Sequence, residues 1–187
     1  PSGAYLAFAE KRARSDSDIL ILAMSKRGDE WTPGPVTPFA DGPAREWDPA
    51  FSPDGKWLAY SSDESGRPEV YLRPFPGPGG KVQVSTAGGS FATWSRSGRE
   101  LVYGRDGELM TAALEITGAS ARVAPPAPWS TRRYDFRGPN RMFDLHPDGT
   151  RVALSLAAET SEPRRRHSAI VMLNFVDDLR RRVPARP

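Results

Sequence analysis

The sequence predicts an all-β fold, a β-propeller of about four blades that forms an incomplete arc of a larger ring. A turn followed by an apolar strand recurs four times, and the turn glycines lie at positions 3, 55, 98 and 149. The spacings of 52, 43 and 51 residues lie at or just above the length of one four-stranded blade. The chain also carries 17 Gly and 19 Pro in 187 residues, which is typical of many short strands joined by tight turns.

Each repeat opens with a hairpin turn, and the clearest copy is Phe51-Ser52-Pro53-Asp54-Gly55. Asp-Gly tolerates the positive φ that such turns need, and the proline presets the dihedral before it. An apolar strand follows, then a polar loop and a second strand, and their near-continuous apolar character indicates sheets covered on both faces. The first strands are 5–8, 57–60, 100–103 and 151–154, and the second strands are 18–22, 69–72, 108–111 and 168–173.

The second repeat predicts a complete blade. Its four strands, from the innermost outwards, are residues 48–52, 56–62, 68–75 and 81–86. The last two are joined by Pro-Gly-Pro-Gly-Gly at 76–80, which excludes a helix there. This turn lacks the Lys-Ser/Thr and the helix of a phosphate-binding loop.

The repeats divide a single propeller region, 1–187, into successive units. The first unit lacks its innermost strand, and the last lacks its fourth. Phe175, Leu179 and Val183 share one helical face, so a short helix is expected before Pro184. A solitary arc exposes strand edges and an apolar face, so the remaining blades of the same propeller are expected partners. The units are a partial blade at 1–43, blades at 44–87, 88–136 and 137–174, and the helix at 175–183.

Composition and motifs argue against several classes of site. The chain has no Cys, which excludes disulfides and thiolate chemistry. His146 and His167 stand beside a turn and an Arg run, with no Cys to complete a metal site, and no Gly-x-Ser-x-Gly elbow occurs. The alternating oxygens of 15–18 lack the Gly and distal Glu of a calcium loop. We expect no catalytic residue, no cofactor and no metal.

The charge distribution does not indicate a nucleic-acid partner. The net charge is +3, but the two Arg runs at 164–166 and 180–182 are local, and two Asp lie beside the second. Such runs are typical of solvated surfaces. No apolar segment approaches the roughly 20 residues that span a bilayer, so a membrane is expected only through a parent chain.

Loops that lead into the innermost strands gather on one face of a propeller, around its channel. Arg, Trp and Asn in such loops are suited to contact a protein or a small ligand. The alternative is that the aromatic residues pack between blades and the arginines only solvate the rim. The candidate contact residues are Arg45, Glu46, Trp47, Ser90, Arg137, Asn140 and Arg141.

The segment from Phe51 through Gly55 to Pro76 resembles the WD-like repeats of the TolB type. More narrowly, the chain is similar to the propeller that follows the kinase domain in bacterial serine/threonine protein kinases. The residues that carry this narrower resemblance are Arg73-Pro-Phe-Pro-Gly-Pro-Gly-Gly-Lys, Trp94-Ser-Arg-Ser-Gly-Arg-Glu-Leu-Val-Tyr and the ending Leu173-Asn-Phe-Val-Asp-Asp-Leu-Arg-Arg-Arg-Val-Pro. Arg96-Ser97-Gly98 and His146 depart from the usual Ser-Pro-Asp-Gly turn. The resemblance implies a sensor or interaction platform in the periplasmic or extracytoplasmic part of a membrane protein.

Two hypotheses of function follow. The first is a non-catalytic propeller module for protein or ligand binding, the C-terminal sensor part of a receptor-like kinase or of a TolB-like protein. The second is a propeller fragment of an enzyme, such as the lid of a peptidase of the prolyl oligopeptidase type. No glycine-rich nucleotide loop, His-Arg-Asp or Asp-Phe-Gly motif is present, so this segment is not expected to be an enzyme itself. The ending in a helix and Pro-Ala-Arg-Pro favours a natural C-terminus, which argues against a downstream hydrolase.

Overall fold

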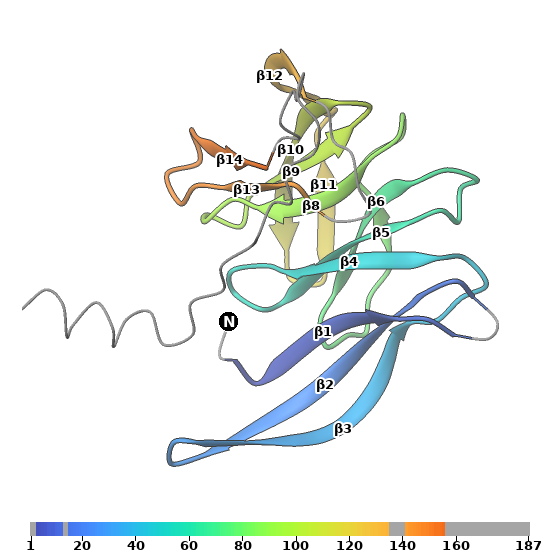
Figure 1. Cartoon of the computed structure of the whole chain (residues 1–187), viewed down its shortest axis with the longest axis vertical. Coiled ribbons are helices and arrows are strands. Elements are labelled where there is room, and N and C mark those ends of the chain that lie inside the picture. Colours follow the sequence, from blue (N-terminus) through green and yellow to red (C-terminus); the bar gives the residue numbers. More distant parts are fainter. Residues whose placement is uncertain (1–2, 13–14, 135–140, 156–187) are drawn as a thin grey trace, which may run out of the picture. The chain divides into compact units, whose positions relative to one another are not determined.

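The computed structural model describes residues 3–12, 15–134 and 141–155, all of which belong to one compact unit spanning 1–157. These residues form fourteen strands in four antiparallel sheets and contain no helix (Figure 1). The expected strand 168–173 and helix 175–183 lie outside the described residues, as do Arg137 and Asn140. The all-β prediction is confirmed for the part of the chain that is described.

The second repeat forms a complete four-stranded sheet in the expected order. It consists of β4 (Glu46–Phe51), β5 (Trp57–Ser62), β6 (Glu69–Pro74) and β7 (Val82–Gln83), paired β4-β5-β6-β7. Strand β7 is shorter than the sequence indicates. The Ser85 hydroxyl accepts the Val70 N–H (2.8 Å), so a side chain replaces the next backbone partner in the ladder.

The other three sheets are variations on this one. The first has the order β1-β2-β3, the third has β8-β9-β10 followed by β11 and β12, and the fourth is the pair β13-β14. Strand β10 is long enough to pair with β12 along its first half and with β11 along its second half. These strands are β1 (Tyr5–Glu10), β2 (Asp18–Arg27), β3 (Glu30–Ala40), β8 (Ser90–Trp94), β9 (Glu100–Arg105), β10 (Glu108–Thr117), β11 (Ser120–Val123), β12 (Ala127–Arg133), β13 (Phe143–Leu145) and β14 (Val152–Leu154).

Strands β3, β11 and β12 are absent from the sequence prediction. Strand β3 contains Pro33, Pro35 and Pro38, which normally argue against a strand because proline has no N–H to donate. In the structure β3 pairs only with β2 and forms the edge of its sheet, where a strand tolerates missing donors.

The hairpin turn of the repeat is built in the same way each time. Gly3, Gly55, Gly98 and Gly149 all have φ between 68° and 76°, in the left-handed region that glycine adopts without strain. In the last three turns the glycine N–H donates to the carbonyl three residues earlier, at 2.9, 3.0 and 2.9 Å. Ser97 takes the place of Asp54 in the third turn, and its hydroxyl accepts the Arg99 N–H, as the Asp54 carboxylate accepts the Lys56 N–H. The third and fourth repeats therefore keep the turn despite their departures in sequence.

Alternate residues of β5 and of β9 face the two neighbouring sheets on opposite sides. Leu58 and Tyr60 pack against sheet β1–β3, while Trp57 and Ala59 join the core shared with sheet β8–β12. Strand β9 repeats the pattern. Its Leu101 and Tyr103 pack toward sheet β4–β7, and its Val102 packs toward sheet β13–β14. Both faces of these sheets are covered, which explains the near-continuous apolar strands. The sheets are stacked as propeller blades are.

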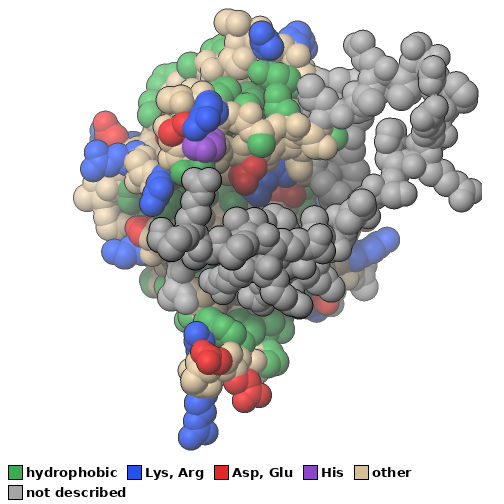
Figure 2. Space-filling view, turned by 60° about the vertical axis from the view of Figure 1, so that its left-hand side comes forward, with side chains coloured by type: hydrophobic (Ala, Val, Ile, Leu, Met, Phe, Trp, Pro, Cys, Tyr) green, Lys and Arg blue, Asp and Glu red, His purple; other side chains and the backbone are tan. Residues whose placement is uncertain are grey.

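The face of sheet β1–β3 that points away from sheet β4–β7, here called its rear face, is partly exposed in the described structure, although Leu20 on that face is buried. Leu6, the repeat equivalent of Leu58 and Leu101, is 54% exposed, whereas both of those are 0% exposed. Cross-strand pairing places Leu6, Leu22 and Val36 in one row, and Val36 is 50% exposed. Figure 2 shows hydrophobic side chains on this lower part of the molecule, above a charged hairpin tip.

Candidate functional site

The segment that leads into β4 presents an arginine stacked on an aromatic ring. The Arg45 guanidinium lies 4.8 Å from the centre of the Trp47 ring. The backbone beneath is fixed by two hydrogen bonds, from the Arg45 N–H to Asp63 Oδ1 (2.9 Å) and from the Asp63 N–H to the Arg45 carbonyl (3.2 Å). Arg45 is exposed and Trp47 is half-buried. The stack is therefore a fixed element of the surface that a partner can contact.

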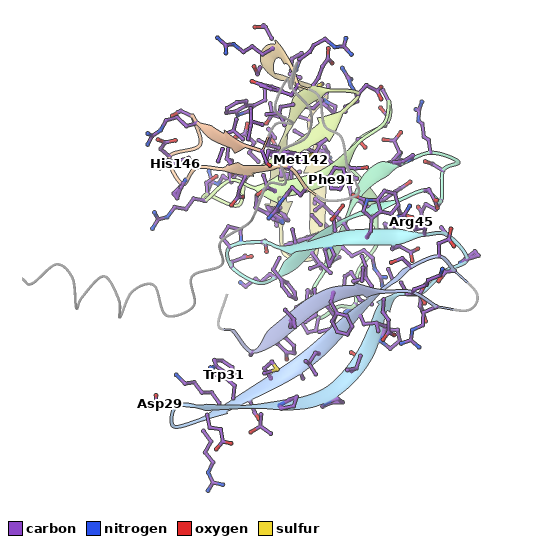
Figure 3. The ribbon with its side chains drawn as sticks, in the orientation of Figure 1. Asp29, Trp31, Arg45, Phe91, Met142 and His146 are labelled. Carbon is purple, nitrogen blue, oxygen red and sulfur yellow. The ribbon has the colours of Figure 1, made fainter. Side chains whose placement is uncertain are left out.

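Strands β4 and β8 carry the same bulge at the same position of the repeat. Asp48 and Phe91 both have positive φ, 52° and 62°, although neither is glycine. Each lies within a register shift, one between Trp47 and Ala50 and the other between Ser90 and Thr93. A bulge re-aims the side chains beside it. Figure 3 labels Arg45, Phe91 and Met142, which lie at or just before the first residues of β4, β8 and β13.

The Asp48 carboxyl interacts electrostatically with two arginines of this region. Burial raises the pKa of its carboxyl to about 6, while Arg141 and then Arg45 lower it. Its Oδ2 is buried and has no hydrogen-bond partner among the described residues. Arg45 and Arg141 come from the segments before β4 and β13, so the fold brings two predicted contact residues of different sheets to act on one carboxylate.

The remaining predicted contact residues lie in different surroundings. Ser90 is half-buried and lines a pocket of about 400 Å³ between the second and third sheets. Glu46 is only 4% exposed, so its side chain lies below the surface that Arg45 and Trp47 present. The structure therefore brings Arg45, Trp47 and Arg141 together with Asp48, which the sequence did not single out.

Acidic residues begin β2, β6 and β10, and the roles of Glu69 and Glu108 were missed in the sequence. Glu69 is 1% exposed, and its Oε1 accepts hydrogen bonds from Arg67 Nε (2.8 Å) and the Gly88 N–H (2.9 Å). Its Oε2 accepts the Ser85 hydroxyl. These bonds tie the end of one blade to the beginning of the next. The recurrence of Asp18, Glu69 and Glu108 at the start of these strands was the available signal.

Glu46 lies in a second inter-sheet pocket, of about 340 Å³. Burial raises the pKa of its carboxyl to about 7, and the charges of Asp18, Glu64 and Asp63 add to the rise, against a smaller opposite effect of Lys81. Its Oε2 is buried without a hydrogen-bond partner in the described part of the chain. A negative charge on a neighbouring carboxylate such as Asp18 makes it harder for the buried Glu46 carboxyl to ionise.

The polar cluster around His146 stabilises a turn. His146 Nδ1 lies 3.0 Å from Asp148 Oδ2, and the same oxygen lies 2.7 Å from an Arg151 nitrogen. The Thr150 backbone N–H and the Arg151 side chain hold the pKa of the Asp148 carboxyl well below its usual range. Figure 2 shows the histidine between acidic and basic side chains. No group of three His, Cys, Asp or Glu among the described residues is arranged to hold a metal ion.

A pocket of about 620 Å³ lies beside the hairpin turns, between Pro53 and Asp54 of one sheet and Arg96–Arg99 and Leu114–Ile116 of the next. Within 3–12, 15–134 and 141–155, no helix has the length and apolar character needed to cross a bilayer.

Comparison with solved structures identifies the fold. TolB from Acinetobacter baumannii is 15% identical over 84% of this chain and 48% of its own, with a TM-score of 0.50. A protein assigned as a 6-phosphogluconolactonase, from Bacteroides uniformis, is 20% identical over 83% of this chain and 45% of its own, with a TM-score of 0.52. No family model and no curated protein matches the sequence. Both neighbours are β-propellers, so the predicted fold is confirmed, and this chain spans about half the length of each.

Proposed function

We propose that the chain is a non-catalytic binding module, and that a protein or a small ligand contacts the loops leading into β4, β8 and β13. The observation that carries the proposal is the stack of Arg45 on Trp47 beside Asp48, with Arg141 acting on the same carboxylate. Arg and Trp are the residues most often responsible for binding energy at interfaces. The likeness to TolB in fold supports a role in binding.

The strands beneath these loops are buried and hydrogen-bonded to one another, which favours binding to a preformed surface. Strand β5 is buried along its whole length, and Ser61 accepts the Phe91 N–H (3.2 Å), which links the second blade to the third. Residues held in advance lose little conformational entropy on binding. The described segments that lead into β4 and β8 are therefore held in place before a partner binds.

A more specific form of the proposal places this module after the catalytic domain of a bacterial receptor-like serine/threonine kinase, outside the membrane. It rests on the sequence resemblance at 73–81, 94–103 and 173–184. In that setting the remaining blades come from the parent chain and cover the row formed by Leu6, Leu22 and Val36. Sequencing upstream of residue 1 is the test. A kinase domain and a membrane span would support the placement, and an initiation codon immediately before residue 1 would refute it.

An enzymatic role is the second candidate, because one structural neighbour is assigned as a 6-phosphogluconolactonase. The feature that favours it is the pocket of about 400 Å³ lined by Arg67, Arg105 and a run of glycine backbone, since phosphate groups bind to such groups. Both guanidinium groups are already bonded to carboxylates, Arg67 to Glu69 and Arg105 to Glu108. Lactone hydrolysis by the purified chain at a rate above buffer would establish this candidate in place of the first.

Site-specific photo-crosslinking in the native host tests the binding surface directly. A photoreactive amino acid is placed at Trp47 in the full chain, and the matched control carries it at Arg27, which is exposed at the tip of the β2–β3 hairpin. We expect a discrete adduct from position 47 only, which Arg45→Glu abolishes. The same adduct from both positions, or none from position 47, would contradict the proposal.

A further inference from the structure

The junctions between the first and second sheets and between the second and third sheets are built alike. In the first junction the Glu46 N–H donates to the Ser17 carbonyl (2.8 Å), and in the second the Gly89 N–H donates to the Pro68 carbonyl (2.9 Å). Each accepting residue is followed by the acidic residue that begins a strand, Asp18 in one case and Glu69 in the other. The two junctions can therefore be compared position by position.

The second junction surrounds its carboxylate with donors. Glu69 receives the Arg67 guanidinium, the Ser85 hydroxyl and the Gly88 N–H, which together engage both of its oxygens. A buried carboxylate is tolerated when it is paired with a cation and hydrogen-bonded in this way. Nothing is left for a ligand to supply.

The first junction lacks those donors and has acidic residues in their places. At the position of Arg67 stands Asp16, at the position of Ser85 stands Asp41, and at the position of Gly89 stands Glu46. A Cβ built on Gly42 would lie 3.6 Å from Glu46 Oε1, so the Glu46 side chain extends toward the Asp41–Gly42 segment, beside the position that Ser85 takes in the other junction.

Glu46 has nothing among the described residues that replaces the missing cation. The residue is 4% exposed, its Oε2 has no hydrogen-bond partner, and it lines the pocket of about 340 Å³. That volume suits a small organic molecule. The burial of Glu46 and its unpaired oxygen thus mark a site that lacks one donor group.

The two cations that line this pocket are engaged elsewhere. Lys81 Nζ bonds to Glu64 and lies 5.1 Å from the centre of the Tyr71 ring. Arg73 donates to the Phe39 carbonyl and lies 4.7 Å from the centre of that ring. Neither has an interaction with Glu46 that satisfies Oε2.

We propose that the pocket between sheets β1–β3 and β4–β7 binds a ligand that carries a protonated primary amine, with the ammonium group donating to the Glu46 carboxylate. The ammonium supplies the cation that Arg67 supplies in the neighbouring junction. A divalent metal is disfavoured, because the described residues hold no set of three ligating side chains. The buried Tyr60 also lines the pocket, and an aromatic residue can add to the binding of a cation.

The electrostatics of the pocket make such binding depend on pH. Burial, Asp18, Glu64 and Asp63 raise the pKa of Glu46 to about 7, Lys81 opposes the rise, and Arg73, Tyr60 and Asp41 also line the pocket. A bound ammonium favours the ionised carboxylate, so binding strengthens as the pH rises from 6 to 8, where the amine is still protonated. The ionised fraction grows about tenfold over this range, and apparent affinity grows with it.

The test uses the full chain with n-butylamine as probe, followed by calorimetry and by the NMR signal of the Glu46 side-chain carboxyl. We expect saturable binding at pH 8 that is about tenfold weaker at pH 6, and a lowered pKa of Glu46 in the complex. Glu46→Gln should weaken binding at least tenfold, whereas Glu115→Gln, at an exposed carboxylate on β10, should leave it unchanged. Butyrate and 1-butanol should not bind.

Several outcomes would overturn the proposal. These are the absence of saturable binding to the unaltered chain, equal binding by Glu46→Gln, and equal binding of butyrate. If Glu46→Gln fails to fold, the pH dependence and the displaced pKa of the unaltered chain still decide the matter. The site is separate from the Arg45–Trp47 stack, so its failure would leave the cross-linking result unaffected.

Discussion

The rear face of sheet β4–β7 and the rear face of sheet β1–β3 are built from the same repeat positions, yet the second is partly exposed among the described residues. Leu58 in the covered face is completely buried, and its equivalent Leu6 in the open face is more than half exposed. The apolar residue is present in both places. A blade therefore carries the pattern for its neighbour whether or not a described neighbour is there, and the pattern itself does not reveal which faces are covered.

Substitution at these two positions should give the largest contrast. We expect Leu58→Ala to lower the free energy of unfolding by about 3–4 kcal/mol, because it removes fully buried methyl groups and leaves a cavity. Leu6→Ala should cost less than about 0.5 kcal/mol, as is usual for exposed positions. Denaturant unfolding of the 187-residue chain measures both. A cost at Leu6 close to that at Leu58 would show that its face is covered in solution.

The same substitution at the two acidic junctions should change the free energy of unfolding in opposite directions. Glu69→Gln should destabilise the chain by about 1–3 kcal/mol, because it weakens a charge-assisted bond and introduces a buried amide N–H that lacks a partner. Glu46→Gln should stabilise the chain at pH 8, by about 2–3 kcal/mol, because it removes a buried carboxylate that has no satisfactory partner.

The pH dependence of the second effect follows from the direction of the pKa shift. The pKa of Glu46 is about 7 in the folded chain and 4.5 without the fold, so below pH 4.5 both states are protonated and Gln gives no advantage. Between pH 4.5 and 7 the unfolded chain ionises first, and the unaltered protein loses stability. Unfolding curves from pH 4 to pH 8 measure the difference. An advantage that is constant across this range would contradict the assignment.

The turns should show the smallest contrast, since they are alike in every blade. Gly55→Ala and Gly98→Ala each place a Cβ at a left-handed residue, with no other atom closer than 3.6 Å. We expect the same cost of about 1–2 kcal/mol at both positions, from backbone strain alone. Thermal unfolding checks this. Clearly different costs would show that the turns depend on the sheets around them.

Sequence reasoning identified those parts of the fold whose signals are local. The Asp54-Gly55 turn and the apolar run after it depend on adjacent residues, and both appear where expected. Strand β3 was missed because prolines are tolerated in an edge strand but not in a central one, and the sequence does not show which strands lie at the edge of a sheet. Strands β11 and β12 share β10, a pairing that no single repeat predicts.

Part of the candidate site could be predicted from the sequence for the same reason. Arg45, Trp47 and Arg141 could be named because they lie in loops beside the repeat motif. The bulges could not be anticipated, since phenylalanine at position 91 rarely adopts the positive φ that the structure requires. The unpaired carboxyl of Glu46 depends on what replaces Arg67 and Ser85 in another blade, and this correspondence comes from the strand pairing of the two junctions.

The prolines of β3 have a consequence for colloidal behaviour. An edge strand with free N–H and C=O groups is a template on which other chains can stack into fibrils. Pro33, Pro35 and Pro38 lack a backbone N–H, which interrupts the row of donors along the long outer strand of the first sheet. Strand β3 is therefore a poor seed for cross-β growth, and the chain can display a long hairpin in concentrated solution without nucleating amyloid along that edge.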